Sequence, residues 1–212
     1  MKKFLTTLLL ALGMAGAYAQ IPAEVTTVMN KSRKTFSSSA GLEYTMDMKT
    51  KLGPVTVMDM RFIIANKGDM SRTKMTVTVL DEEVTTESGF DGKEAWEIKR
   101  SKGRDSIIFS QKKKDDGVSD FDLDLDKNYR KAKMKNKGDY YEITFSDPVD
   151  KKSETKKVTV KISTKTYRLL EMKTSARGAN VVMTFSKYRV GLQDDYFKVN
   201  LSRYPKAVVV RK

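Results

Sequence analysis

The chain has 212 residues, a formal net charge of +14 at pH 7, and neither cysteine nor histidine. The absence of these two residue types excludes disulfides, zinc sites of the usual ligand sets, Cys–His nucleophiles and Ser–His triads. The positive charge favours contact with anionic surfaces such as phospholipid head groups or acidic glycolipid. Lysines that keep the outer face of a large sheet soluble account for much of the same charge.

The first nineteen residues have the pattern of an export signal. Lys2 and Lys3 precede an apolar run from Leu5 to Ala15, which is too short to span a bilayer, and Ala17-Tyr18-Ala19 fits a small-x-small cleavage site. We therefore expect residues 1–19 to be a signal peptide and residues 20–212 to form a single domain in the periplasm. Export makes a nucleic-acid partner unexpected.

One helix is predicted near the start of the mature chain, from Pro22 to Ser37. Pro22 suits the first turn, and Glu24 suits the positive end of the helix dipole. The apolar side chains near one face of this helix are Val25, Val28, Met29 and Phe36. So narrow a face is typical of a helix that lies on a sheet.

Alternating apolar and polar residues predict strands over most of the remaining chain. Short turn signals separate them, among them Gly53-Pro54 and Asp91-Gly92. About ten strands are expected, all antiparallel, so a sheet this long must curl or close. The predicted strands cover residues 41–49, 58–64, 70–80, 85–90, 95–99, 105–111, 140–146, 157–163, 170–173 and 181–190, with 196–201 and 207–210 as candidates to close the sheet.

The alternation fails between Lys112 and Lys137. This charged segment has few anchors (Phe121, Leu123, Leu125 and Tyr129), so it is predicted to be a loop with one or two short helices. Its acidic run from Asp120 to Asp126 lacks the glycine and the final glutamate of a calcium-binding loop, which favours a solvated acidic turn.

No motif in the sequence supports catalysis. Two Ser-x-x-Lys matches begin at Ser71 and Ser110, but neither opens a predicted helix or has the partner motifs of a penicillin-binding nucleophile. No pair of carboxylates stands out for glycoside hydrolysis. We therefore expect a protein that is not an enzyme and that has no catalytic residue, metal or cofactor.

Methionines are concentrated at the apolar positions of the predicted strands. Two of the twelve, Met1 and Met14, lie in the leader, and the other ten belong to the mature chain. Methionine is flexible and polarisable, so it suits a surface that repacks around variable apolar ligands, although composition alone favours an ordinary core with methionine in place of leucine. A concave apolar face with little covering helix leaves room for a ligand.

Several short motifs follow one another in an order typical of one protein family. They are Ser88-Gly89-Phe90-Asp91-Gly92-Lys93-Glu94-Ala95-Trp96, Tyr129 to Phe145 with Lys137-Gly138-Asp139, Val181 to Val190, Tyr196-Phe197-Lys198-Val199 with Pro205 and Val208, and Lys31-Ser32-Arg33 in the helix. In this order they resemble the periplasmic lipoprotein carrier (LolA-type) family. The chain departs from that family at Lys67-Gly68, where the family has a basic residue before proline, and in the acidic stretch from Phe121 to Asp126, which replaces lid helices.

The resemblance implies a mainly β fold: a strongly curved antiparallel sheet that forms an incomplete, half-open barrel with a helical lid over an apolar cavity. Val25, Val28, Met29, Phe36, Phe121, Leu123 and Leu125 are expected in the lid. The residues expected to line the cavity are Leu42, Tyr44, Met46, Met48, Met58, Met60, Phe62, Ile64, Met75, Val77, Trp96, Ile98, Tyr141, Ile143, Phe145, Leu170, Met172, Met183 and Phe185.

The resemblance further implies a monomeric carrier that shuttles acylated lipoproteins from an inner-membrane ABC-type exporter to an outer-membrane acceptor. Two alternatives remain open. One is an envelope sensor of the same fold that binds lipid or lipoprotein, and the other, from a different class, is a non-carrying structural or adhesive β-domain with a dry core. An enzyme that acts on lipid or glycan is the least supported interpretation.

Overall fold

A single twelve-stranded sheet dominates the structure, a computed structural model that describes residues 21–36, 40–79, 82–101, 104–111, 123–176 and 178–212. Strands make up 60% of the chain. The elements are α2 (Ala23–Phe36), β1 (Leu42–Leu52), β2 (Val55–Lys67), β3 (Met70–Val79), β4 (Glu82–Phe90), β5 (Ala95–Ser101), β6 (Arg104–Ser110), α3 (Leu125–Asn128), β7 (Tyr129–Asn136), β8 (Tyr140–Pro148), β9 (Lys157–Ser163), β10 (Leu169–Ala176), β11 (Ala179–Val190), the 3-10 helices η1 (Asp194–Phe197) and η2 (Leu201–Arg203), and β12 (Val208–Arg211).

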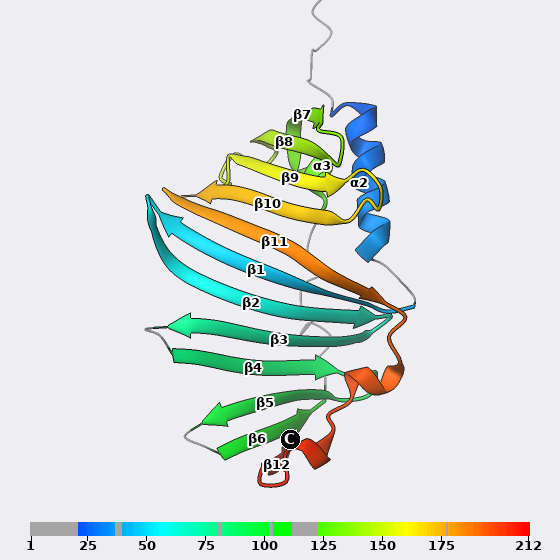
Figure 1. The fold of residues 1–212 in the computed structure, drawn as a ribbon, viewed down its shortest axis with the longest axis vertical. Coiled ribbons are helices and arrows are strands. Elements are labelled where there is room, and N and C mark those ends of the chain that lie inside the picture. Colours follow the sequence, from blue (N-terminus) through cyan, green and yellow to red (C-terminus); the bar gives the residue numbers. More distant parts are fainter. Residues whose placement is uncertain (1–20, 37–39, 80–81, 102–103, 112–122, 177) are drawn as a thin grey trace, which may run out of the picture.

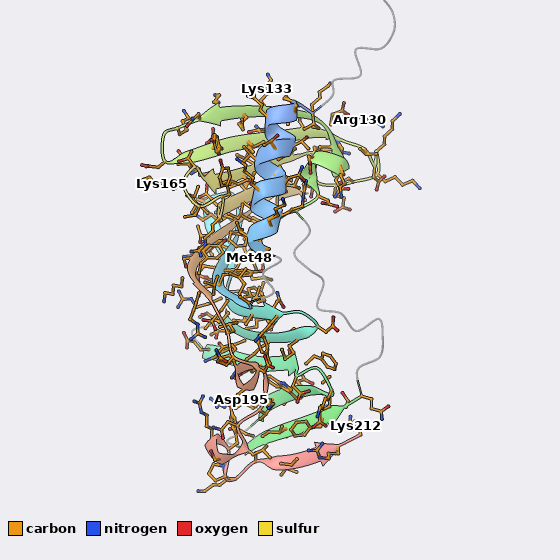
Figure 2. The ribbon with its side chains drawn as sticks, turned by 90° about the vertical axis from the view of Figure 1, so that its right-hand side faces the viewer. Met48, Arg130, Lys133, Lys165, Asp195 and Lys212 are labelled. Carbon is orange, nitrogen blue, oxygen red and sulfur yellow. The ribbon has the colours of Figure 1, made fainter. Side chains whose placement is uncertain are left out.

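The sheet consists of two meanders that join through the first strand. Strands β1 to β6 follow one another as neighbours, as do β7 to β11, and β1 pairs with β11, giving the order β12-β6-β5-β4-β3-β2-β1-β11-β10-β9-β8-β7. Figure 1 shows the strands as one ladder, with α2 beside one end and the C-terminal segment beside the other. Seen from the side, the sheet is curved and strongly twisted (Figure 2).

The expected fold class is confirmed, and so are the helix and the ten predicted strands, which correspond to β1 to β6 and β8 to β11. Turn chemistry explains the tight connection between β4 and β5: Asp91 Oδ1 accepts hydrogen bonds from the backbone N–H groups of Lys93 and Glu94, both at 2.9 Å, and Gly92 has a φ of 94°. This hairpin contains the Ser88–Trp96 motif.

Two predictions about the irregular segments were wrong. Residues 129–136 form strand β7, because Ala132 and Met134 pack on the core from one side of the strand while Lys131, Lys133 and Lys135 lie on the other, and Tyr129 is buried where the strand begins. Residues 196–201 are not a strand but belong to a segment with two 3-10 helices, whose apolar side chains pack onto the sheet. Residues 208–211 do form a strand, β12, but it adds a parallel edge strand next to β6 and does not close the sheet. Phe121 lies outside the described residues.

The two faces of the sheet are covered at opposite ends. Helix α2 packs against the face that carries Tyr44, Met46, Ile143 and Phe145, which we call the helix face. Residues 192–207 pack against the other side of strands β2 to β6, which we call the tail face. Each strand therefore presents one set of alternate residues to each face, and the register decides which set is buried.

Opposite charges face one another across strands on the uncovered part of the tail face. Glu171 accepts from Lys161 at 2.9 Å and from Lys173 at 3.2 Å. Partial burial by itself would raise the pKa of Glu171, but the hydrogen bonds from these two lysines outweigh it and lower that pKa. At the edge of the sheet, Arg130, Lys131 and Lys133 of β7 are exposed, and Figure 2 shows Arg130 and Lys133 at that end of the molecule. Such charges blunt an edge strand against pairing with other chains.

Trp96, on which the C-terminal segment packs, lies directly against a glycine. A Cβ atom at Gly89 would lie 2.4 Å from the carbonyl oxygen of Ser71 and 2.6 Å from Cζ2 of Trp96. We expect Gly89→Ala to lower the free energy of unfolding by about 1–3 kcal/mol, because the strand or the indole must shift. Urea denaturation measures this change.

Ser88→Ala is the matched control, since Ser88 is the neighbouring residue of the same strand and faces the other side. Its expected effect is within about 0.5 kcal/mol. Equal stability of the two variants would contradict the close packing of Trp96 on Gly89.

Candidate functional site

An apolar row crosses nine strands of the helix face without interruption. Each residue in it pairs directly with the next across the ladder. At about 4.8 Å per strand, eight spacings give a row on the order of 40 Å long. In strand order from β7 to β4, the row is Met134, Ile143, Val160, Met172, Met183, Met48, Met60, Val77 and Val84.

Helix α2 buries one half of this row. Ile143 and Val160 are fully buried, as are Val25 and Met29 on the helix, and Met172 is 6% exposed. The helix buries its narrow apolar face here because residues three and four apart lie on the same side. This half is packed as a core.

Aromatic side chains close the core where α2 ends. The ring of Phe36 meets that of Tyr44 edge-on at 5.3 Å between centroids, and Tyr44 stacks on Tyr188 at 5.8 Å. The hydroxyl of Tyr188 donates to the carbonyl oxygen of Leu169 at 2.7 Å, and burial raises the pKa of this hydroxyl well above its ordinary value. Tyr188 therefore acts as a buried structural group.

An arginine ties the lid helix to the segment before β7. Arg33 donates to both carboxylate oxygens of Asp126, at 2.6 and 3.0 Å, and to the carbonyl oxygen of Leu123 at 3.0 Å. Leu123 and Leu125 are buried against the same core. Of the residues expected in the lid, Val25, Val28, Met29, Phe36, Leu123 and Leu125 thus lie together.

The other half of the row is left open by the described residues. Met48, Met60 and Val77 are partly exposed, and Val84 is 51% exposed at the far end. Met58, which shares this face, is 44% exposed. Met75 and Phe62 continue the same surface in the adjoining row, where Phe62 packs on the edge of the core. An apolar strip thus runs from the covered core into an uncovered region.

Most residues expected to line a cavity share the helix face. The register and the core cluster bring together Leu42, Tyr44, Met46, Met48, Met58, Met60, Phe62, Ile64, Met75, Val77, Tyr141, Ile143, Phe145, Met172, Met183 and Phe185. Three others lie elsewhere. Trp96 and Ile98 are on the tail face, buried with Ile107 and Phe109 beneath the C-terminal segment. Leu170 stands at a register shift, so Leu169 takes the buried position.

Sequence reasoning missed several members of this face. Met134 and Ala132 lie on β7, which was predicted to be a loop, and Val84 lies before the predicted start of β4. Ala132 and Met134 alternate with Lys131, Lys133 and Lys135, and this period of two is the signal that would have located β7. Val158, Val160 and Ile162 of β9 were also left out of the expected lining. They alternate with polar residues in the sequence, and all three are buried.

The described residues offer no site for metal chemistry. Within them, no group of three or more aspartate, glutamate, histidine or cysteine residues is placed to hold a metal ion. The helices in this part of the chain include none that is long and apolar enough to cross a membrane.

Comparison with known proteins places the fold. No family model and no curated protein matches the sequence. Lipoprotein LppX from Mycobacterium tuberculosis is 13% identical with a TM-score of 0.50, over 80% of this chain and 97% of its own. The chain has the LolA/LppX-like fold.

Two further solved structures match over most of both chains. An uncharacterized conserved protein from Thermus thermophilus is 10% identical with a TM-score of 0.50, over 89% of this chain and 99% of that one. A LolA superfamily protein from Nitrosomonas europaea is 11% identical over 82% and 97% of the two chains, with a TM-score of 0.37. At an identity of 10%, the Thermus match with a TM-score of 0.50 supports a likeness of fold alone.

The two halves of the row differ in how well they are packed, and two methionines test this. We expect Met29→Ala to lower the free energy of unfolding by about 2–5 kcal/mol, because it leaves a cavity under α2. Met58→Ala removes a side chain that is 44% exposed and is expected to stay within about 0.5 kcal/mol of the wild type. Urea denaturation compares them, and a large loss in Met58→Ala would mean that the open half is packed.

Proposed function

We propose that this protein is a periplasmic carrier that holds the acyl chains of lipoproteins against the helix face and moves them from the inner to the outer membrane. In this proposal, residues 1–19 direct export and are removed, and residues 20–212 act as one monomeric domain. An inner-membrane ABC-type exporter loads the carrier, and an outer-membrane acceptor receives the cargo. The protein itself carries out no catalysis.

The observation that carries the proposal is the nine-strand apolar row, packed at one end and open at the other. A row on the order of 40 Å long is a surface on which an extended hydrocarbon chain can lie. The packed half keeps the sheet folded in the absence of cargo. The open half, with Met48, Met60 and Val77, supplies apolar area that the described part of the protein leaves partly exposed.

The side chains of the open half suit a variable apolar ligand. Met48, Met58, Met60 and Met75 are unbranched and can change rotamer to follow different acyl chains. Burial of an acyl chain is favourable by about 0.8 kcal/mol per methylene, so ten methylenes correspond to about 8 kcal/mol. Burying part of one acyl chain against the strip is thus favourable relative to leaving it in water. Transfer from the strip to a membrane, which buries the whole acyl chain, lowers the free energy further.

A pair of substitutions on adjacent residues of β3 tests this proposal. Val77 belongs to the apolar row, while Thr78 is exposed on the opposite face. We expect Val77→Asp to weaken binding of a fluorescently labelled triacylated lipopeptide at least tenfold, because a carboxylate would be desolvated against the acyl chain. Thr78→Asp, with the same change in charge, is expected to bind like the wild type. Fluorescence anisotropy with delipidated mature protein measures both affinities.

Cargo and transfer are tested separately. Mature protein isolated from the periplasm is expected to contain bound lipoprotein or lipid by mass spectrometry, and to release lipoproteins from spheroplasts. Protein that binds the lipopeptide but releases nothing would favour an envelope sensor of the same fold. Protein that neither binds nor releases would contradict the carrier and favour a structural β-domain.

A further inference from the structure

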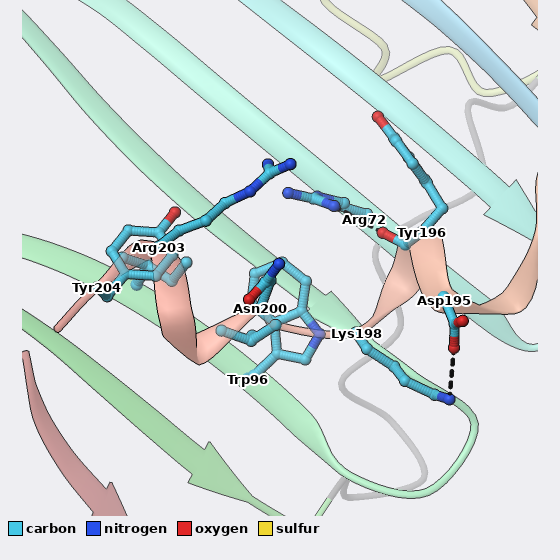
Figure 3. A pocket seen from close by; sticks show the side chains of 10 residues that line it. Arg72, Trp96, Asp195, Tyr196, Lys198, Asn200, Arg203 and Tyr204 are labelled. Carbon is cyan, nitrogen blue, oxygen red and sulfur yellow. Dashed lines mark hydrogen bonds and ion pairs between the residues drawn. The ribbon is translucent and has the colours of Figure 1, made fainter.

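A pocket on the tail face is separate from the apolar row. It lies between the C-terminal segment and strands β3 to β5 and has a volume of about 300 Å³, at the lower end of the range for small-molecule sites. Figure 3 shows its lining, with Trp96 as the floor and Arg72, Asn200, Arg203 and Tyr204 around it. The sheet stands between this pocket and the helix face.

The floor and one wall of the pocket are fixed by contacts within the protein. The indole Nε1 of buried Trp96 donates to the carbonyl oxygen of Phe197 at 2.8 Å. Arg72 donates to the carboxylate of Glu87 and, at 2.6 Å, to the carbonyl oxygen of Tyr196, and its guanidinium stacks at 4.9 Å from the centre of the Tyr196 ring. These side chains therefore hold their positions before any ligand arrives.

The remaining polar groups of the pocket are donors without acceptors. Asn200 Oδ1 accepts from the backbone N–H of Ser202 at 3.1 Å and from its hydroxyl at 2.6 Å, and no described residue accepts from the Asn200 amide nitrogen. Within the described part of the chain, the guanidinium of Arg203 and the hydroxyl of Tyr204 also have no hydrogen-bond or ion-pair partner.

The nearby carboxylates are already engaged. Asp195 accepts from Lys198 at 2.8 Å, and Glu87 is paired with Arg72. Arg203 is therefore the lining cation that lacks a counter-charge among the described residues. Figure 3 shows the guanidinium groups of Arg203 and Arg72 pointing toward one another. Arg72 already has Glu87 as its counter-charge, so Arg203 supplies the net positive charge of the pocket, and an anion bound beside it would gain charge-assisted hydrogen bonds.

We propose that this pocket binds the oxyanion group of a small ligand, a phosphate or a carboxylate, between Arg203 and Arg72. The amide of Asn200 and the hydroxyl of Tyr204 supply further donors, and the guanidinium fork suits two oxygens of the same group. The body of the ligand lies on Trp96 and Ile98, an aromatic and aliphatic floor. This site does not depend on the acyl-binding proposal, because it lies on the other face of the sheet.

The protein provides its own probe for this site, because Trp96 is the only tryptophan in the chain. The test is a titration of the mature protein with inorganic phosphate, glycerol 3-phosphate and acetate at constant ionic strength, with chloride as the reference anion and tryptophan emission as the signal. At least one oxyanion is expected to give a saturable change. Arg203→Ala is expected to weaken that affinity at least tenfold, and Arg203→Lys by less, since lysine keeps the charge but loses the fork.

Arg130→Ala is the matched control, because Arg130 is exposed at the far end of the sheet and its loss changes the net charge equally. It is expected to bind like the wild type, and all variants are expected to unfold at the same urea concentration, since both arginines are exposed. A non-saturable response, a response matched by chloride, or equal affinity in Arg203→Ala would overturn the proposal. The ratio of the affinities for acetate and for phosphate then identifies which oxyanion the site prefers.

Discussion

Each strand of a single-layered sheet has two faces, and this chain covers different faces at the two ends of one sheet. Helix α2 buries the helix face across β7 to β11 and β1, whereas residues 192–207 bury the tail face across β2 to β6. Helix-face residues on β3 to β5, such as Val77, Val84 and Glu97, are outside both clusters. The apolar strip is a consequence of this arrangement, because neither of these two covers extends over it and no other described segment does.

The change of buried face is visible in the residue pattern of neighbouring strands. On β3, Met75 and Val77 face the helix side, whereas on β5 the apolar residues Trp96 and Ile98 face the tail side. Across neighbouring strands, Ile64 pairs with Thr73, Thr73 with Ser88, and Ser88 with Glu97. The helix face therefore becomes polar from β2 toward β5. Burial on one side only requires a polar opposite side. The strands under the tail meet that requirement along Thr73, Ser88 and Glu97, whereas Met60, Val77 and Val84 stay apolar and partly exposed.

Local sequence was sufficient for most of this fold and insufficient where a partner element decides the outcome. Alternation located ten strands, and the narrow apolar face of 22–37 located α2, because both depend on periods of two and 3.6 residues. It could not assign Trp96 to a face, because alternation alone does not say which side is covered. Only the packing of Phe197 and Tyr204 onto the sheet identifies the buried side of β5.

Other errors have equally local causes. The shift at Leu169 places one extra residue in β10, and this exchanges the expected position of Leu170 with that of its neighbour. Apolar and polar residues alternate well enough in 196–201 to predict a strand. In the structure, the backbone here turns through the two 3-10 helices η1 and η2, whose side chains line the pocket. Tertiary contacts overrode strand propensity there, as is common for short segments.

The separation of the two faces also separates their chemistry. On the helix face, flexible methionines adjoin a packed core, so a ligand there gains by dispersion and desolvation without a fixed geometry. On the tail face, Trp96 and Arg72 are held by hydrogen bonds, so a ligand there meets directed donors in fixed positions. A one-residue slip of β3 or β5 would exchange their faces and disrupt both surfaces at once. The strand register that folds the sheet is therefore also what keeps an adaptable apolar surface and a rigid polar pocket apart in one layer.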